Sequence, residues 1–89
     1  MVIKFFASIR DCTHAKEINF EACETLDELL RKLCAKYGKR FEEKVFKNGQ
    51  ISDQIIIFIN GRHLSHLDSV NPKLQPQDEI SIFPVVAGG

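Results

Sequence analysis

The chain has 89 residues, and its 12 Lys and Arg side chains balance its 12 Asp and Glu side chains. This length predicts one small domain, and the absence of net charge gives no electrostatic reason to bind nucleic acid or an anionic membrane. No apolar run approaches the ~20 residues that a membrane span needs. The opening stretch MVIKFFASIR carries no export signature, so we expect a cytoplasmic protein.

The first half of the chain predicts two strands and a helix. Residues 2–8, VIKFFAS, are rich in strand formers, and residues 16–21, KEINFE, alternate polar and apolar side chains. We expect these two strands to pair as a hairpin across the polar stretch RDCTHA. Residues 25–37 predict the main helix, because Thr25 and Glu28 form a capping box and apolar side chains recur at helical spacing. Gly38 then stops the helix.

The second half predicts the rest of a sheet. KRFEEKVFKNGQ indicates a short helical turn that Asn48–Gly49 closes. Residues 54–60, QIIIFIN, are apolar on both faces and predict a central strand, which Asn60–Gly61 turns into the short return strand RHL. Residues 79–83, EISIF, predict the last strand, with Ile80 and Ile82 facing the core.

This element order predicts an α+β roll in which one helix covers one face of a mixed sheet. The other face is left to solvent or a partner, and a parallel pairing of the first and last strands fits the order. We expect residues 1–83 to form the folded domain and residues 84–89 to form an extended tail.

The domain itself offers few groups for chemistry. It has no nucleotide-binding glycine loop and no zinc-protease or serine-hydrolase motif. His63 and His66 lack a third ligand, so no metal site is predicted. The three cysteines, an odd count without a CxxC pair, are expected to be buried or half-buried free thiols: Cys12, Cys23 and Cys34.

The closing stretch FPVVAGG has the composition of a stiff, extended segment with a narrow end. Pro84 stiffens it and lacks an N–H, so we expect sheet pairing to end there. Val85 and Val86 favour extended backbone. The last three residues, Ala87, Gly88 and Gly89, have little or no side chain. They can therefore pass through a channel that is too narrow for larger side chains. This shape suits presenting the Gly89 carboxylate to the active site of another protein.

The stretches IKFFASIR, TLDELLRKL, IFINGR and DEISIFPVVAGG together resemble the MoaD/ThiS family of sulfur carrier proteins, and most closely the small subunit of molybdopterin synthase. The usual family ending is Phe-Pro-Pro-Val-Ala-Gly-Gly, and here Val85 replaces the second proline. The resemblance implies a β-grasp, ubiquitin-like fold. It also implies that an E1-like enzyme, using ATP and Mg²⁺, adenylates Gly89, which a sulfur donor protein then converts to a thiocarboxylate.

The resemblance further implies that the carrier binds no cofactor and is not an enzyme alone. Its tail, residues 84–88, would thread into the large synthase subunit of a heterotetramer and pass sulfur to a molybdopterin precursor. We expect docking on the sheet face away from the helix, where Phe6 and Phe83 would form an exposed apolar patch.

Two other uses of the same tail stay open. The sulfur could serve another pathway, such as thiamine thiazole synthesis or tRNA thiolation. Alternatively, the chain is a ubiquitin-like modifier joined through Gly89 to lysines of other proteins. What becomes attached at Gly89, sulfur or lysine, separates these alternatives.

Overall fold

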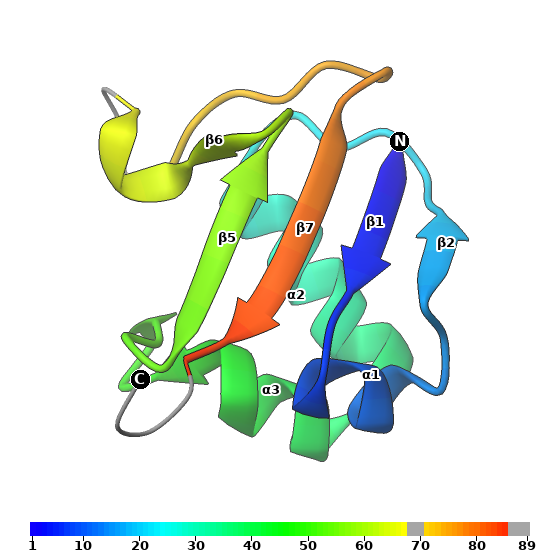
Figure 1. Ribbon diagram of the computed structural model, residues 1–89, viewed down its shortest axis with the longest axis vertical. Coiled ribbons are helices and arrows are strands. Elements are labelled where there is room, and N and C mark those ends of the chain that lie inside the picture. The colour runs from blue at the N-terminus through cyan, green and yellow to red at the C-terminus, as the bar shows by residue number, and fades with distance from the viewer. Residues whose placement is uncertain (68–70, 86–89) are drawn as a thin grey trace.

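A computed structural model describes residues 1–67 and 71–85 of the protein. Five strands form a mixed sheet in the order β2-β1-β7-β5-β6 (Figure 1). β1 and β7 run parallel, and the other neighbours in the sheet are antiparallel, which confirms the expected pairing of the first and last strands. The strands are β1 (Val2–Phe5), β2 (Glu17–Asn19), β5 (Ile55–Ile59), β6 (Arg62–His63) and β7 (Glu79–Pro84).

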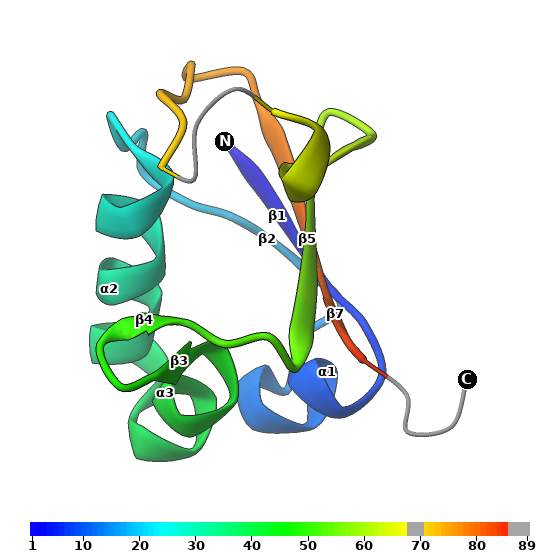
Figure 2. The ribbon, with the colours of Figure 1, turned by 90° about the vertical axis from the view of Figure 1, so that its left-hand side faces the viewer.

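Two helices cover one face of this sheet, α2 (Leu26–Tyr37) and α3 (Lys39–Val45) (Figure 2). α2 confirms the predicted main helix. The Thr25 hydroxyl accepts a hydrogen bond from the Glu28 N–H at 3.3 Å, while the Glu28 carboxylate accepts from the N–H of Glu24 at 3.0 Å. Gly38, with φ +91°, ends α2 and precedes α3. None of the helices within the described ranges is long and apolar enough to cross a membrane.

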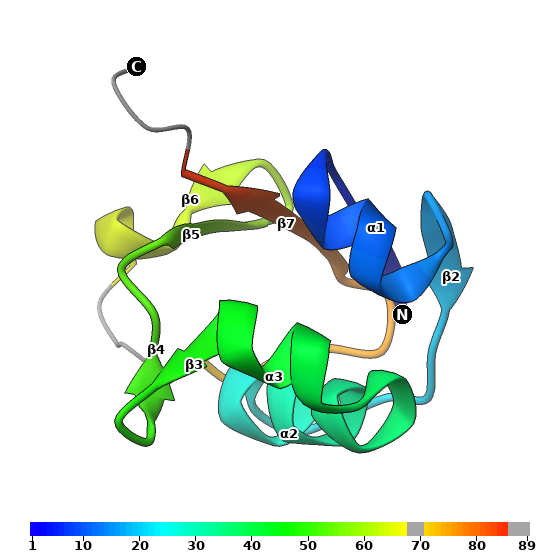
Figure 3. The ribbon, with the colours of Figure 1, turned by 90° about the horizontal axis from the view of Figure 1, so that it is seen from below.

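The structure also contains a third helix that the sequence did not predict, α1 (Ser8–Thr13), which follows β1 (Figure 3). β1 therefore ends at Phe5 rather than at residue 8, and Ala7, at φ +49°, turns the chain into the helix. β1 and β2 still pair antiparallel, but a helix rather than a simple loop joins them. A helix of six residues is marginal alone, and its buried residues Ile9, Cys12 and Thr13 anchor it to the core.

A two-stranded hairpin follows α3, β3 (Phe46–Lys47) and β4 (Gln50–Ile51), and Asn48–Gly49 forms its turn as predicted. The single core lies between the inner sheet face and the helices. Its buried apolar residues are Ile3, Phe5, Ile9, Cys12, Cys23, Leu26, Leu29, Leu30, Leu33, Phe41, Val45, Ile55, Ile57, Ile59, Leu74, Ile80 and Ile82. All three cysteines are free, and Cys34 is half-buried, as the sequence predicted.

β5 lies between β7 and β6, which confirms that it is an interior strand, and β7 occupies the middle of the sheet. β7 pairs with β1 from Glu79 to Ile82 and with β5 as far as Pro84, whereas β6 pairs with only two residues of β5. β5 is apolar on both faces. Its outer residues Ile56 and Phe58 are half-buried, so that part of the outer sheet face carries apolar side chains.

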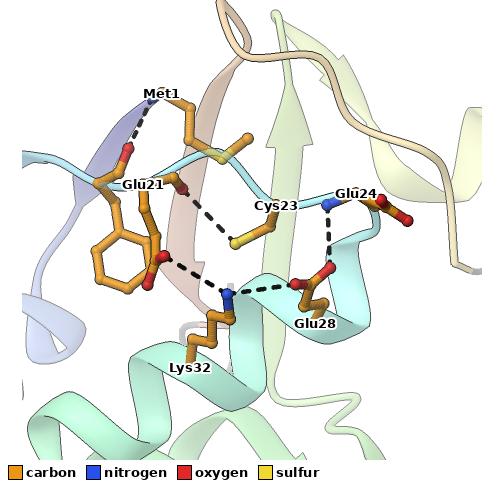
Figure 4. A network of polar contacts seen from close by, with 7 residues as sticks. Met1, Glu21, Cys23, Glu24, Glu28 and Lys32 are labelled. Atoms are coloured by element: carbon orange, nitrogen blue, oxygen red, sulfur yellow. Dashed lines mark hydrogen bonds and ion pairs between the residues drawn. The ribbon is translucent and has the colours of Figure 1, made fainter.

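A polar network ties the segment between β2 and α2 to the helix (Figure 4). The Lys32 ammonium lies 3.6 Å from the Glu21 carboxylate and 3.3 Å from that of Glu28. The Cys23 thiol donates to the Glu21 carbonyl. Burial raises the pKa of the Cys23 thiol, so it stays protonated near neutral pH and serves packing rather than nucleophilic chemistry.

Candidate functional site

β7 carries the chain from the centre of the sheet to the predicted tail. The Asn60 N–H donates to the Glu79 carbonyl at one end of the β5–β7 ladder, and the Val85 N–H donates to the Gln54 carbonyl at the other, both at 2.8 Å. Hydrogen-bonded and non-hydrogen-bonded pairs alternate in an antiparallel ladder. Pro84 consequently faces Ile55 in a non-hydrogen-bonded pair, where its missing N–H removes no bond to β5. The strand and its paired residues end at Pro84, as predicted, and a single further hydrogen bond, from the Val85 N–H, follows.

An aromatic cluster covers the outer sheet face beside this exit. The rings of Phe6 and Phe83 stack with centroids 4.0 Å apart and an interplanar angle of 8°. The Phe58 ring meets Phe83 edge-on at 5.6 Å, and the His63 ring meets Phe58 at 5.3 Å. We call these four residues, Phe6, Phe58, His63 and Phe83, the aromatic cluster.

The structure brings Phe6 and Phe83 together on the outer face, but the expected exposure is wrong. Both are half-buried because each ring covers a face of the other. Sequence reasoning missed Phe58 and His63. The alternation of inward and outward side chains along β5 could have predicted the position of Phe58. Ile55, Ile57 and Ile59 point inward, so the residues between them point outward.

Among the large apolar side chains of the described residues, Val85 is the one classed as exposed, at 38%. A shallow depression of about 340 Å³ adjoins it and Pro84. The residues that line it include charged side chains of both signs, Glu43, Lys44 and Lys47. The base of the tail thus leaves the sheet between an aromatic face and a mixed-charge groove.

Cys34, on α2, carries a half-buried free thiol. Burial, together with the charge of Glu42, raises the pKa of the Cys34 thiol to about 11, so the thiol is protonated at neutral pH. Within residues 1–67 and 71–85 no three His, Cys, Asp or Glu side chains are grouped to hold a metal ion. Of the predicted tail residues, Pro84 and Val85 are described, whereas Val86, Ala87, Gly88 and Gly89 lie outside the described residues.

The sequence and fold match known proteins along most of the chain. The model of the ThiS family matches residues 3–89. The small archaeal modifier protein 3 of Haloferax volcanii is 32% identical, over 98% of this chain and 96% of the relative. A putative sulfur carrier protein of Archaeoglobus fulgidus is 35% identical over 73% of this chain and 74% of its own length.

A solved structure shows the same fold. The putative molybdopterin converting factor subunit 1 of Pyrococcus furiosus superposes with a TM-score of 0.74 at 27% identity, covering 96% of this chain and 95% of that one. The mixed sheet with its parallel β1–β7 pair and packed helix is the β-grasp arrangement of ubiquitin-like proteins. From this fold and the family match along residues 3–89, we conclude that the chain belongs to the ThiS family of ubiquitin-like sulfur carriers.

Proposed function

We propose that the carboxylate of Gly89 is converted to a thiocarboxylate, which donates sulfur for molybdopterin biosynthesis. The observation that carries this proposal is the ThiS family match, because it extends to residue 89 and includes the Gly88–Gly89 pair. The likeness to a putative molybdopterin converting factor subunit supports molybdopterin as the product.

The proposed chemistry takes place in partner proteins. A carboxylate resists attack until one oxygen becomes a good leaving group. In an E1-like enzyme with Mg²⁺, a Gly89 oxygen would attack the α-phosphorus of ATP and expel pyrophosphate. The terminal sulfur of a persulfide on a donor protein would then attack the acyl carbon and expel AMP. A thiol would cleave the sulfur–sulfur bond of the resulting acyl disulfide, leaving the thiocarboxylate on Gly89 and a disulfide on the donor. The resulting thiocarboxylate sulfur is softer and more nucleophilic than the oxygen it replaces.

The carrier's own part is to dock and to deliver the tail. β7 is paired with β1 as far as Ile82 and with β5 as far as Pro84, so it gives residues 84–89 a fixed base. We propose that the aromatic cluster, with Phe6 and Phe83 nearest the exit, docks on the E1-like enzyme and on the large subunit of a heterotetrameric molybdopterin synthase. The chain would act in the cytoplasm as a co-substrate and not as an enzyme.

A second candidate function follows from the Haloferax volcanii relative, which is named a modifier protein. The same activated Gly89 would be attacked by a lysine ε-amine of a target protein, forming an isopeptide bond with loss of the leaving group. The two functions share every step up to the acyl-adenylate.

The mass of the protein recovered gently from its own cells tests both candidates. Replacement of one oxygen by sulfur at Gly89 would support the carrier, and a Gly89–lysine branch would support the modifier. If the mass shows an unmodified Gly89 carboxylate, the protein should next be incubated with ATP and an E1-like enzyme from the same cells. Absence of an acyl-adenylate there would count against both. The same spectrum shows whether Gly89 is the last residue.

A further inference from the structure

The charged side chains are segregated along the molecule although their numbers balance. Residues 21–28, EACETLDE, hold four acidic side chains and no basic one, whereas residues 36–47, KYGKRFEEKVFK, hold five basic side chains against two acidic ones. These segments lie at the two ends of α2, and the second lies at the end of the molecule where β7 stops (Figure 2). Positive charge is therefore concentrated near the place where the tail leaves the sheet.

Five residues make up this positive surface, which we call the basic end: Lys36, Lys39, Arg40, Lys44 and Lys47. Lys44 and Lys47 border the base of the tail, because they line the same depression as Pro84 and Val85. Lys44 is half-buried, and the other four residues of the basic end are exposed. A protein that takes hold of the tail at its base must therefore meet these charges.

Ion pairs within the chain do not neutralise the basic end. On α2, the Asp27 carboxylate and the Arg31 guanidinium, four residues apart, pair at 2.8 Å. Lys39 and Glu43 have the same spacing on α3, but in the reverse and less favourable order. Across the part of the chain that the structure describes, none of the five basic side chains forms an ion pair. Their charges are thus available to a second molecule.

We propose that the basic end docks against an acidic surface that borders the channel of the enzyme that activates Gly89. This role rests on the proposed function, since it assumes that such an enzyme receives the tail. The enzyme must approach the end of the molecule where β7 stops, and the surface beside Pro84 there includes two lysines. Carboxylate side chains around the entrance of its channel would complement that charge.

Segregated charge also orients the carrier before contact. The acidic segment and the basic end give the protein an electric dipole, which an acidic surface turns so that the positive end faces it. The tail leaves at that end and would therefore approach first. Charges at the rim of an interface mainly change the association rate constant and its salt dependence. This effect needs no net charge, so the balance of acidic and basic side chains does not oppose it.

Reversals of single exposed charges test the role. At about 50 mM salt, we expect K39E, R40E and K47E each to lower the association rate constant with the E1-like enzyme of the same cells by about threefold or more. The dissociation rate constant should stay within about twofold. K73E makes the same change in net charge at an exposed residue beside Thr25, at the opposite end of α2, so it should change the association rate constant by less than about twofold.

Salt separates an electrostatic role from a structural one. In about 1 M salt the Debye length falls to about 3 Å, so the differences between the variants and the wild type should largely disappear. Equal association rate constants for the wild type, K39E, R40E and K47E at low salt would overturn the role. An equal loss in K73E would also overturn it, because net charge alone would then explain the effect.

A titration without the enzyme tests the surface itself. Octaglutamate added to ¹⁵N-labelled full-length protein at low salt should shift the amide resonances of residues 36–47 more than those of residues 21–28, and less so in the K39E/K47E double variant. Absence of such shifts would overturn the basic end as a site for an acidic protein, and tighter binding of octauridylate would overturn it in favour of RNA. If the wild type does not associate with the E1-like enzyme, the proposed function is contradicted, and the titration still decides what the basic end binds.

Discussion

The rings of Phe6 and Phe83 stack in parallel although one residue follows the first strand and the other lies in the last. The register explains the contact. β1 and β7 run parallel with Phe5 beside Ile82, so the next residue of each points to the outer face at the same level. The stacked pair therefore lies at the end of the sheet from which the tail departs.

We expect Phe83→Ala to weaken binding to the E1-like enzyme by tenfold or more, because aromatic side chains dominate protein interfaces. The loss of the stacked ring should also lower the free energy of unfolding by about 1–2 kcal/mol, less than for a fully buried ring. Calorimetric titration and urea denaturation measure the two effects. Phe46→Ala is the matched control, since Phe46 is also half-buried. Phe46 follows α3 and packs against the Arg31 guanidinium, outside the aromatic cluster. Equal binding by both variants would contradict a docking role for the cluster.

Asp78 is a buried carboxylate that holds the start of β7. It accepts hydrogen bonds from the Asn60 side-chain amide at 2.8 Å and from the Gln75 N–H at 2.7 Å. Asp78→Ala leaves both donors without this acceptor, so we expect the free energy of unfolding to fall by about 2–3 kcal/mol. Asp53→Ala, at an exposed carboxylate, should change it by less than about 0.5 kcal/mol in the same urea titration. If Asp78→Ala lowered the free energy of unfolding by no more than Asp53→Ala does, water would be replacing the carboxylate as acceptor.

Deletion of Gly89 should abolish adenylation while leaving the melting temperature unchanged. The reacting carboxylate would then belong to Gly88 and sit about 3.5 Å short of its place. Gly89→Phe should fail as well, since a ring cannot follow a backbone-wide channel. ATP–pyrophosphate exchange and a thermal melt measure the two properties. Lys73→Ala, at an exposed side chain, serves as the control. Exchange at the wild-type rate by the deleted chain would refute the carrier proposal.

The Cys34 thiol should react slowly with iodoacetamide near neutral pH. With a pKa of about 11, raised by burial, about one thiol in a thousand is ionised at pH 8. Because only the thiolate reacts, the rate should climb with pH until about pH 11. Peptide mass mapping against Cys34→Ser assigns the modified site. A rate at pH 8 equal to that of free cysteine would show that the thiol is not shielded.

How far the sequence predicts the fold depends on whether its signals are local. α2 could be predicted because its cap, apolar stripe and terminal Gly38 all lie within the helix or next to it. α1 could not, because its N-cap residue Ala7 supplies no capping side chain and its stability comes from burying Ile9 and Cys12 against distant elements. The helix is a product of tertiary packing that a reading of local signals cannot detect.

The candidate site divides in the same way. The alternation in β1 and β7 correctly placed Phe6 and Phe83 on the outer face, since strand periodicity is local. The bond from Val85 to Gln54 could not be foreseen, because it depends on the register between two strands far apart in sequence. That register also decides that Pro84 falls where the ladder needs no donor to β5.

The position of β7 also governs when the protein can fold. Its residues come last among the strands, yet both β1 and β5 depend on it for their main pairing. A nascent chain that stops before Glu79 has helices and outer strands but no strand to join the two halves of the sheet. Such contacts between distant residues form late and slowly. Almost the entire described chain must therefore leave the ribosome before folding can be completed. A prematurely terminated product that lacks β7 would remain incompletely folded. We expect proteases to degrade such a product, so it would not compete for the partners of the full-length protein.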